Sequence, residues 1–316
     1  MKKLLVVGAS GLVGQMVMEV LAEEKMISDF EITLASSSVS IGKVVMYNGR
    51  FFRFVYLSEK LLAKKFDYVI FASGDEISKV WVKSFVETGA VVIDNSNAFR
   101  REAGVPLVVP EINFDNINKN NKIISNPNCS TIQLVVVLDR LLKLSAIETI
   151  VVSSYQSVSG AGREALLDLK NKTKDCFDVD ISKNIIPQIG GVLENGFCTE
   201  EDKIMFESNK ILKTNIHIVA TTVRVPIPYC HGESVYIKFE NNIDLNDIKN
   251  ILKSDYIEVC DGVVYPESIE NSNKTYVCRL RKVSENEVSM FILANNLRRG
   301  AAYNAVLILK NLNSNK

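Results

Sequence analysis

Apolar residues occur in short, uninterrupted runs along the first part of the chain, and helical patterns separate these runs. We predict buried strands at 3–7, 31–35, 68–72 and 91–94, with shorter ones at 107–109 and 122–125. Stretches 12–24 and 76–88 space their apolar residues as helices do. Alternation of continuous apolar strands with helices is typical of a parallel sheet that is covered on both faces.

The pattern changes after Asn126-Pro127-Asn128. A strongly apolar helix is expected at 129–144, and longer strands follow at 149–155, 217–225, 234–239, 276–281 and 288–294. A polar segment at about 168–215 shows no clear strand, and 297–312 is helical again. Strands that adjoin with few helices between them indicate a mixed, largely antiparallel sheet. We therefore predict an α/β protein with two domains, and the boundary between them is a switch of pattern without a flexible linker.

Composition and charge narrow the function classes. The chain has 316 residues, of which 47% are apolar and 23% charged, with 37 basic and 37 acidic side chains. This balance argues against disorder, and the absence of a basic block argues against nucleic-acid binding. No apolar run approaches the roughly 20 residues of a membrane span, and Leu4–Val7 is too short for a signal sequence. The six scattered cysteines indicate reduced thiols in a cytoplasmic protein, with neither disulfides nor a metal site.

A glycine-rich loop joins the first strand to the first helix. Gly8, Gly11 and Gly14 follow a GxxGxxG spacing, close to the GxGxxG of dinucleotide-binding loops. Glycines permit the tight turn, and the first helical N–H groups then face a pyrophosphate. The alternative is a purely structural turn, but the position at the start of a βαβ pattern favours a nucleotide. The second strand ends in Ser36-Ser37-Ser38, without the acidic residue typical of NAD sites, so a 2′-phosphate would be tolerated.

A cysteine stands at the predicted start of the long helix. Cys129 follows Asn126-Pro127-Asn128 and precedes Ser130, a polar and turn-forming context. The positive end of a helix dipole favours the thiolate, which is the nucleophilic form of cysteine. The alternative is a thiol packed as a small apolar residue, which suits Cys260 and Cys278 better. Cys129 is therefore a candidate nucleophile.

A family resemblance rests on motifs spread along the whole chain. These are DNSNAFR (94–100), VPEIN (109–113), SNPNCST (125–131), SYQSVSGAG (154–162), IPQIG (186–190), TEEDK (199–203), ESNKI (207–211), RVPI (224–227), HGES (231–234) and NLRRGAA (296–302). In this order they resemble aspartate-semialdehyde dehydrogenase. The resemblance implies NADPH-dependent reductive dephosphorylation of L-aspartyl 4-phosphate to L-aspartate 4-semialdehyde, in lysine, threonine, methionine and diaminopimelate biosynthesis.

The resemblance also assigns roles to residues. It implies Cys129 as the thioester-forming nucleophile, Gln156 as the group that orients the reacting carbonyl and His231 as the general acid/base. Substrate binding would fall to the following charged residues: Arg224 for the carboxylate, Glu200 for the ammonium, and Arg100 and Lys203 for the phosphate. The residue types suit these tasks, because an acyl phosphate needs cations at its leaving group and arginine can bind a carboxylate with two bonds. Taken alone, Arg100 and Lys203 would read as solvated surface charges.

Cofactor, domains and assembly follow from the same resemblance. NADP(H) would contact the pyrophosphate loop, the end of the second strand and a nicotinamide side, namely Ser10, Gly11, Leu12, Val13, Ser37, Ser38, Ser159, Gly160 and Asn296. The NADP-binding domain would comprise 1–128 with 295–316, the last helix packing back onto it, and 129–294 would form an α+β catalytic and dimerisation domain. We expect a homodimer or homotetramer that acts on small-molecule substrates in the cytoplasm, with no nucleic acid, membrane or metal.

The histidines and the rival functions complete the sequence-based expectations. His217 lies within an apolar strand and is assigned to structure, whereas His231 sits in a turn that should expose it. Glu207 and Lys210 are spaced as a helical pair. Rival functions are N-acetyl-γ-glutamyl-phosphate reductase, glyceraldehyde-3-phosphate dehydrogenase and a non-catalytic nucleotide sensor. The motif around Cys129 disfavours the first two, and the joint presence of the four catalytic and carboxylate-binding side chains disfavours the third.

Overall fold

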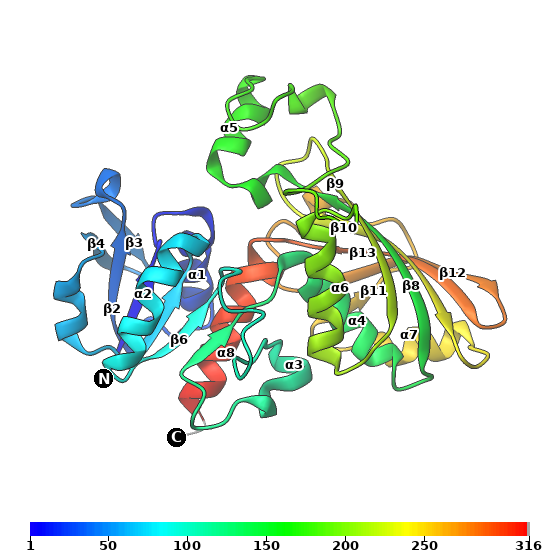
Figure 1. Cartoon of the computed structure of the whole chain (residues 1–316), viewed down its shortest axis with the longest axis horizontal. Coiled ribbons are helices and arrows are strands. Elements are labelled where there is room, and N and C mark those ends of the chain that lie inside the picture. The colour runs from blue at the N-terminus through cyan, green and yellow to red at the C-terminus, as the bar shows by residue number, and fades with distance from the viewer. Residues whose placement is uncertain (315–316) are drawn as a thin grey trace. The chain divides into compact units, whose positions relative to one another are not determined.

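The structure, a computed structural model, describes residues 1–314 and divides into two compact units (Figure 1). The first unit comprises Met1–Pro127 and the C-terminal segment from Ala301, and the second is Asn128–Gly300. Asn128 and residues 295–300 thus group with the second unit, whereas the sequence placed them with the first. Residues 315–316 of the expected C-terminal segment lie outside the described residues.

The first unit is built on a seven-stranded sheet in the order β3-β4-β2-β1-β5-β6-β7. Every neighbouring pair is parallel except β3 and β4, which form an antiparallel hairpin at one edge. The strands are β1 (Lys2–Val7), β2 (Phe30–Ser36), β3 (Val44–Tyr47), β4 (Arg50–Tyr56), β5 (Tyr68–Phe71), β6 (Val91–Asp94) and β7 (Ile123–Ser125). The helices are α1 (Leu12–Glu23), α2 (Asp75–Glu87), α3 (Pro110–Asn113) and α8 (Tyr303–Ser314).

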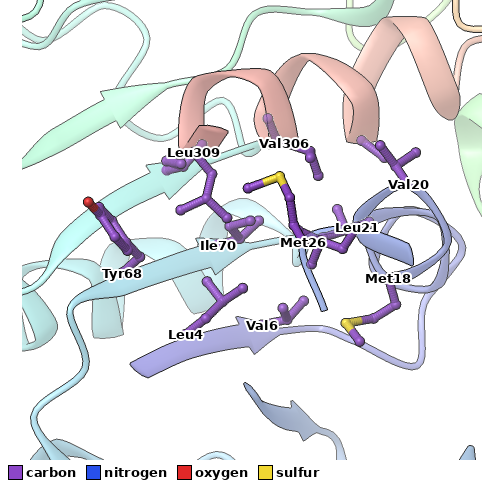
Figure 2. Close-up of a cluster of buried hydrophobic side chains, with 14 of the residues drawn as sticks. Leu4, Val6, Met18, Val20, Leu21, Met26, Tyr68, Ile70, Val306 and Leu309 are labelled. Atoms are coloured by element: carbon purple, nitrogen blue, oxygen red, sulfur yellow. The ribbon is translucent and has the colours of Figure 1, made fainter. Parts of the chain in front are cut away.

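Helices cover both faces of this sheet, as the continuous apolar strands predict. Successive side chains of a strand point to opposite faces, so Leu4 and Val6 join one buried cluster while Leu5 and Val7 join another. Figure 2 shows the first cluster, where side chains of β1 and β5 meet those of α1 and α8. The C-terminal helix therefore completes the core of the N-terminal unit.

The second unit carries a six-stranded mixed sheet in the order β11-β12-β13-β10-β8-β9. The pairs β12–β13, β13–β10 and β10–β8 are antiparallel, and β11–β12 and β8–β9 are parallel. The strands are β8 (Ile147–Gln156), β9 (His217–Arg224), β10 (His231–Phe239), β11 (Ile257–Val259), β12 (Thr275–Ser284) and β13 (Glu287–Ala294). The helices are α4 (Cys129–Leu141), α5 (Arg163–Asn171), α6 (Thr199–Leu212) and α7 (Leu245–Leu252), and α4, α6 and α7 pack on one face of the sheet (Figure 1).

The two-domain α/β class predicted from the sequence is confirmed, and several local expectations are wrong. The β3–β4 hairpin was not expected, although Asn48-Gly49 between the two strands is a strong hairpin signal. Residues 107–109 form no strand and contribute a single bridge, Leu107 to Ser125. The polar segment 168–215 contains no strand, as expected, but helices α5, α6 and α7 were not predicted. Within residues 1–314, no helix is long and apolar enough to cross a membrane.

Candidate active site

The glycine loop borders a cavity in the first unit. Gly8 has a φ of +76°, and a Cβ there would lie 2.4 Å from the carbonyl oxygen of Ala72. A Cβ on Gly14 would lie 2.3 Å from the carbonyl oxygen of Gly8, so both positions require glycine. Gly11 caps α1 and lines the cavity. The loop therefore holds the N-terminus of α1 close to the ends of β1 and β5.

This cavity has a volume of about 470 Å³ and lies at the C-terminal ends of parallel strands. In open α/β sheets that is the position where nucleotides bind. Of the residues expected to contact the cofactor, Ser10, Gly11, Ser37 and Ser38 line this cavity, whereas Leu12 and Val13 form the first turn of α1 and are not among its lining residues. Gly8 of the glycine loop and Ser36 at the end of the second strand line it as well. Further lining residues were not singled out from the sequence, namely Val7, Tyr56, Leu57, Ala72, Ser73, Ile77 and Trp81. The lining combines an apolar wall with serine hydroxyls and contains no charged side chain.

Three of the expected site residues meet in the second unit because of the strand directions. Gln156 ends β8 and pairs with Arg224, which ends the parallel strand β9. His231 begins β10, which runs antiparallel to β8. The C-termini of β8 and β9 and the N-terminus of β10 therefore lie at one edge of the sheet. All three side chains are nearly or fully buried.

Cys129 is the first residue of α4 and is half-buried. Asn128 caps the helix, and its Oδ1 accepts from the backbone N–H of Ser130 at 2.9 Å and of Thr131 at 3.3 Å. The backbone N–H of Asn128 donates to Glu207 at 2.7 Å. Asn128 thus stabilises the helix start that presents the thiol. Glu207, expected to serve only as half of a helical pair, supports this turn as well.

Glu200 lies at the centre of the buried polar network. Its Oε1 accepts from Asn128 Nδ2 at 2.8 Å and from Gln156 Nε2 at 3.2 Å, and its Oε2 accepts from Lys203 Nζ at 3.1 Å. Burial raises the pKa of Glu200, but the Lys203 charge and these hydrogen bonds outweigh it, so the pKa lies below its usual value. The carboxylate is therefore ionised and links the helix of Cys129 to Gln156.

Arg224 brings the positive charge of this site. Its Nη1 donates to the carbonyl oxygen of Ser157 at 2.7 Å, and only 5% of the residue is exposed. Burial lowers the pKa of Arg224, while the nearby Glu200 and Cys129 act to raise it. A buried guanidinium beside a thiol and a carboxylate is suited to binding an anionic substrate group.

His231 is fully buried, so the expectation of an exposed side chain is wrong. The backbone places it as the first residue of a central strand, directly after the left-handed residue Cys230 at φ +71°. Its Nδ1 accepts from the backbone N–H of Ser157 at 3.0 Å, so the neutral ring carries its proton on Nε2. Burial, aided by the Arg224 charge, lowers the pKa of His231 to about 3. Nε2 is buried and has no hydrogen-bond partner among the described residues.

The expected nicotinamide-side residues lie around this histidine. A Cβ on Gly160 would lie 2.8 Å from Arg224 Nη1 and 3.2 Å from His231 Nε2, so only glycine leaves the two side chains in place. Asn296 Nδ2 donates to Ser159 Oγ at 3.0 Å, and Asn296 Oδ1 accepts from the backbone N–H of Cys230 at 3.0 Å. Ser159 and Asn296 therefore hold the turn before His231 through bonds within the protein.

The remaining expected residues fall in different places. Lys203 belongs to the second unit, where it pairs with Glu200. Arg100 belongs to the first unit, is buried, and donates from Nη2 to the carbonyl oxygen of Asn95 at 2.8 Å. His217 begins β9 and is exposed, so it does not belong to the apolar core. In the described part of the chain, no cluster of histidine, cysteine and acidic side chains could hold a metal.

Ser157 was not singled out from the sequence, although it contributes directly to the site. Its backbone N–H and hydroxyl both lie beside His231 Nδ1, and its carbonyl oxygen binds Arg224. Its place in the SYQSVSGAG motif was the available signal. Together, a thiol at a helix start, a buried cation, an ionised carboxylate and a neutral imidazole can support nucleophilic attack on an anionic acyl substrate.

Comparisons with known proteins agree with this architecture. Residues 3–120 match the family model described as "Semialdehyde dehydrogenase, NAD binding domain", and residues 138–299 match "Semialdehyde dehydrogenase, dimerisation domain". The aspartate-semialdehyde dehydrogenase of Aquifex aeolicus is 39% identical over an alignment of 330 positions, which covers 96% of this chain and 95% of that protein. The chain belongs to the aspartate-semialdehyde dehydrogenase family.

Solved structures of family members have the same fold. Aspartate semialdehyde dehydrogenase II from Vibrio cholerae, complexed with ASA, has a TM-score of 0.93 and 35% identity, with 98% of this chain and 97% of that one covered. The Candida albicans enzyme with NADP has a TM-score of 0.77 and 26% identity over 98% and 97% of the two chains. Membership of the family makes the protein an oxidoreductase of amino-acid biosynthesis with a pyridine nucleotide cofactor, which confirms the function expected from the motifs.

Proposed function

We propose that this member of the family reduces L-aspartyl 4-phosphate to L-aspartate 4-semialdehyde, releasing phosphate, through a thioester on Cys129. The observation that carries the proposal is one buried network in the second unit: Glu200 accepts from Gln156 and from Asn128, the residue before Cys129. Arg224 and His231 both bond to the backbone of Ser157, the residue after Gln156. Such a network binds a zwitterionic amino acid and presents its acyl carbon to a thiol. We further place the enzyme in the aspartate pathway of the cytoplasm.

The covalent step begins with attack of the Cys129 sulfur on the acyl carbon. The bond from that carbon to the phosphate oxygen breaks, and the phosphate departs with the electron pair. Arg100 and Lys203 are the cations we assign to this leaving group, because negative charge accumulates on its oxygens. The helix dipole at the start of α4 favours the thiolate that makes the attack.

Substrate recognition uses the opposite charges of Arg224 and Glu200. The guanidinium of Arg224 binds the substrate carboxylate, and the Glu200 carboxylate binds the substrate ammonium. Gln156 already donates to Glu200, and it orients the reacting carbonyl from this fixed position. The charges of Arg224 and Glu200 are both buried. A substrate with an uncharged amino group, or without a carboxylate, would therefore leave one of the two residues without a counterion.

His231 donates and accepts the proton at the reacting oxygen. Its Nε2–H is positioned to donate to the carbonyl oxygen, where negative charge develops in each tetrahedral intermediate. The Arg224 charge helps burial to lower the pKa of His231. A substrate carboxylate bound to Arg224 offsets that charge, so substrate binding raises the pKa and prepares His231 for acid/base exchange.

We infer that the cofactor is NADP(H), held in the first unit by Ser10, Gly11, Leu12 and Val13 at the pyrophosphate and by Ser37 and Ser38 at the adenosine ribose. Gly8 and Gly14 admit no side chain, and the cavity beside them fits a nucleotide. When bound, the nicotinamide supplies the hydride that reduces the thioester. We assign Ser159, Gly160 and Asn296 to the nicotinamide side. No carboxylate lines the cavity, so no negative charge would repel a 2′-phosphate, and we expect a preference for NADP. Equal turnover with NADH would contradict that preference.

We propose a homodimer, or a homotetramer built from such dimers, formed through the second unit. Side chains of β8 that point away from the helix layer include Val151 and Tyr155, which are 41% and 40% exposed. A second copy that covers this sheet face would remove them from water. A monomeric mass in solution, with full activity at micromolar concentration, would contradict the assignment.

The function is tested by presenting two acyl phosphates in parallel. With NADPH, L-aspartyl 4-phosphate should be reduced, whereas N-acetyl-γ-glutamyl phosphate should not, because it lacks the ammonium that Glu200 binds. Reduction of the second substrate alone would make the protein a reductase of N-acetylated acyl phosphates. Turnover of neither, with NADPH still bound, would indicate a nucleotide sensor.

A further inference from the structure

Glu201 is a buried acidic residue that follows Glu200 on helix α6 and takes no part in the proposed reaction. It is the third residue of the helix, and only 8% of it is exposed. An acidic side chain in the first turn of a helix is stabilised by the helix dipole even when it faces water. A buried one also needs hydrogen-bond partners, because removing a charged group from water is costly. The partners of Glu201 therefore indicate its task.

The two carboxylate oxygens of Glu201 accept hydrogen bonds from two different elements. Oε2 accepts from the backbone N–H of Cys198, the N-cap residue of α6, at 2.8 Å. This contact is that of a capping box, and it needs only one of the two oxygens. Oε1 accepts from the backbone N–H of Thr222 on strand β9 at 3.0 Å. The carboxylate thus joins the first turn of α6 to β9.

The place of β9 in the sheet gives this contact its importance. β9 stands at the edge of the six-stranded sheet, where the outward N–H groups of a strand have no neighbouring strand to bond. Glu201 supplies the acceptor for Thr222, and Cys198 Sγ lies 3.2 Å from Thr222 Oγ1. Two residues further along, Arg224 exchanges backbone hydrogen bonds of 2.8 and 3.0 Å with Ile186. The outer edge of β9 is therefore held at two successive positions.

The bridge through Glu201 connects the two charges that we assign to substrate recognition. Glu200 is the residue before Glu201 on α6, and Arg224 is two positions after Thr222 on β9. Alternate residues of a strand point to the same face, so Thr222 and Arg224 share the buried face of β9. The helix turn that carries Glu200 is therefore fixed against the strand end that carries Arg224.

We propose that Glu201 is a positioning residue that sets the spacing between Glu200 and Arg224, and that it thereby selects substrates with an ammonium and a carboxylate on the same carbon. This inference rests on the proposed function. A carboxylate accepts at both oxygens, whereas an amide accepts at its oxygen and donates from its nitrogen. Glu201→Gln has nearly the native volume but satisfies only one of the two N–H groups, so it breaks the bridge.

The kinetic test uses the full-length enzyme and two ligands. In Glu201→Gln, KM for aspartate semialdehyde should rise about tenfold or more with kcat within about threefold, because the substrate-binding charges shift while Cys129 and His231 remain. 4-Oxobutanoate is aspartate semialdehyde without its amino group, so it uses Arg224 and not Glu200. Its inhibition constant against aspartate semialdehyde should change by about twofold or less. Equal weakening of both ligands would disprove the spacing role.

A matched control separates spacing from stability. Ile204 is fully buried on the same helix, about one turn after Glu201. Ile204→Val loosens the packing of α6 and leaves the hydrogen bonds of Glu201 intact. This variant should have a lower thermal midpoint than the native enzyme and a KM near the native value. A tenfold rise of KM in Ile204→Val would show that any weakening of α6 suffices, and it would overturn the proposal.

Hydrogen exchange of backbone amides tests the bridge in the absence of substrate. In NMR spectra of the ¹⁵N-labelled enzyme, Glu201→Gln should speed exchange about tenfold or more at the amide of Cys198, of Thr222 or of both. The Arg224 amide, which bonds to Ile186, should stay within about threefold of its native rate. Native exchange rates at both Cys198 and Thr222 would overturn the bridge. Failure of the proposed reaction would leave these rates unaffected, so the two failures are distinguishable.

Discussion

A single methyl group added at Gly300 is expected to displace Cys129, the proposed nucleophile. Gly300 lies in the π-helical turn Arg298–Ala302. A Cβ at this position would lie 2.7 Å from the Cβ and 3.0 Å from the Cα of Cys129. Non-bonded carbon atoms normally remain about 3.5 Å or more apart, so Gly300→Ala must separate the two segments by nearly 1 Å. Because the atoms of Cys129 involved include backbone, no side-chain rotation relieves the contact.

The expected magnitudes follow from this displacement. Overpacking of this kind costs about 1–3 kcal/mol of folding free energy, which a protein of this size should survive. A shift of about 1 Å at a reacting group costs up to roughly 100-fold in rate. We therefore expect Gly300→Ala to remain folded and to lose about 10-fold to 100-fold in kcat.

Two measurements test this expectation. The first is the rate of phosphate-dependent oxidation of aspartate semialdehyde, monitored through the formation of reduced cofactor. The second is the rate at which iodoacetamide alkylates Cys129. Gly262→Ala is the matched control, because no heavy atom lies within 4 Å of a Cβ built at Gly262. Native kcat and native alkylation rate in Gly300→Ala would refute the reasoning.

Three further predictions concern His231, Arg224 and the exposed His217. Histidine in an unfolded chain titrates near 6.5, whereas burial and Arg224 lower the pKa of His231 to about 3, so the stability from this group is complete above pH 6.5 and is lost as the pH falls. His231→Asn should abolish this loss, so that the free energy of unfolding in urea falls by about 2 kcal/mol less for the variant than for the native protein between pH 7 and pH 5. The variant should also have a kcat about 100-fold or more below native. Equal acid sensitivity of the two proteins would be inconsistent with a neutral His231. Arg224→Lys should chiefly raise KM for the semialdehyde, by about tenfold, because lysine keeps the charge but loses the paired hydrogen bonds. An unchanged KM in initial-rate kinetics would argue against binding of the substrate carboxylate by Arg224. His217→Ala should match the native enzyme in both assays, since the exposed His217 takes no part in the site.

Much of the fold is predictable because burial leaves a local pattern. The strands of the first unit are buried on both faces, so they appear as continuous apolar runs such as Tyr68–Phe71. The start of α1 is equally clear, because Gly8 and Gly14 can be no other residue. Edge elements are less predictable: Val44, Met46 and Phe51 of the β3–β4 hairpin are exposed apolar residues, and their sequence resembles neither a buried strand nor a loop.

The site shows where local reasoning fails. Helix α6 buries Glu200, Glu201 and Glu207, which a sequence pattern assigns to a solvated face. Their burial depends on partners far along the chain, such as Asn128 for Glu207. The burial of His231 likewise depends on the left-handed backbone of Cys230, which returns the chain into the sheet. Residue types therefore identified the chemistry, but tertiary contacts determine the charge states.

The covalent role of Cys129 is tested most directly by trapping the acyl-enzyme. The native enzyme is mixed with L-aspartyl 4-phosphate in the absence of cofactor, released phosphate is measured, and the peptide that contains Cys129 is examined by mass spectrometry. We predict a burst of about one phosphate per active site, an aspartyl group on Cys129, and its loss with formation of semialdehyde when NADPH is added. The Cys129→Ser variant should show almost no burst, because a hydroxyl ionises far less readily than a thiol. Acylation of another residue, or a full burst from Cys129→Ser, would contradict the thioester mechanism.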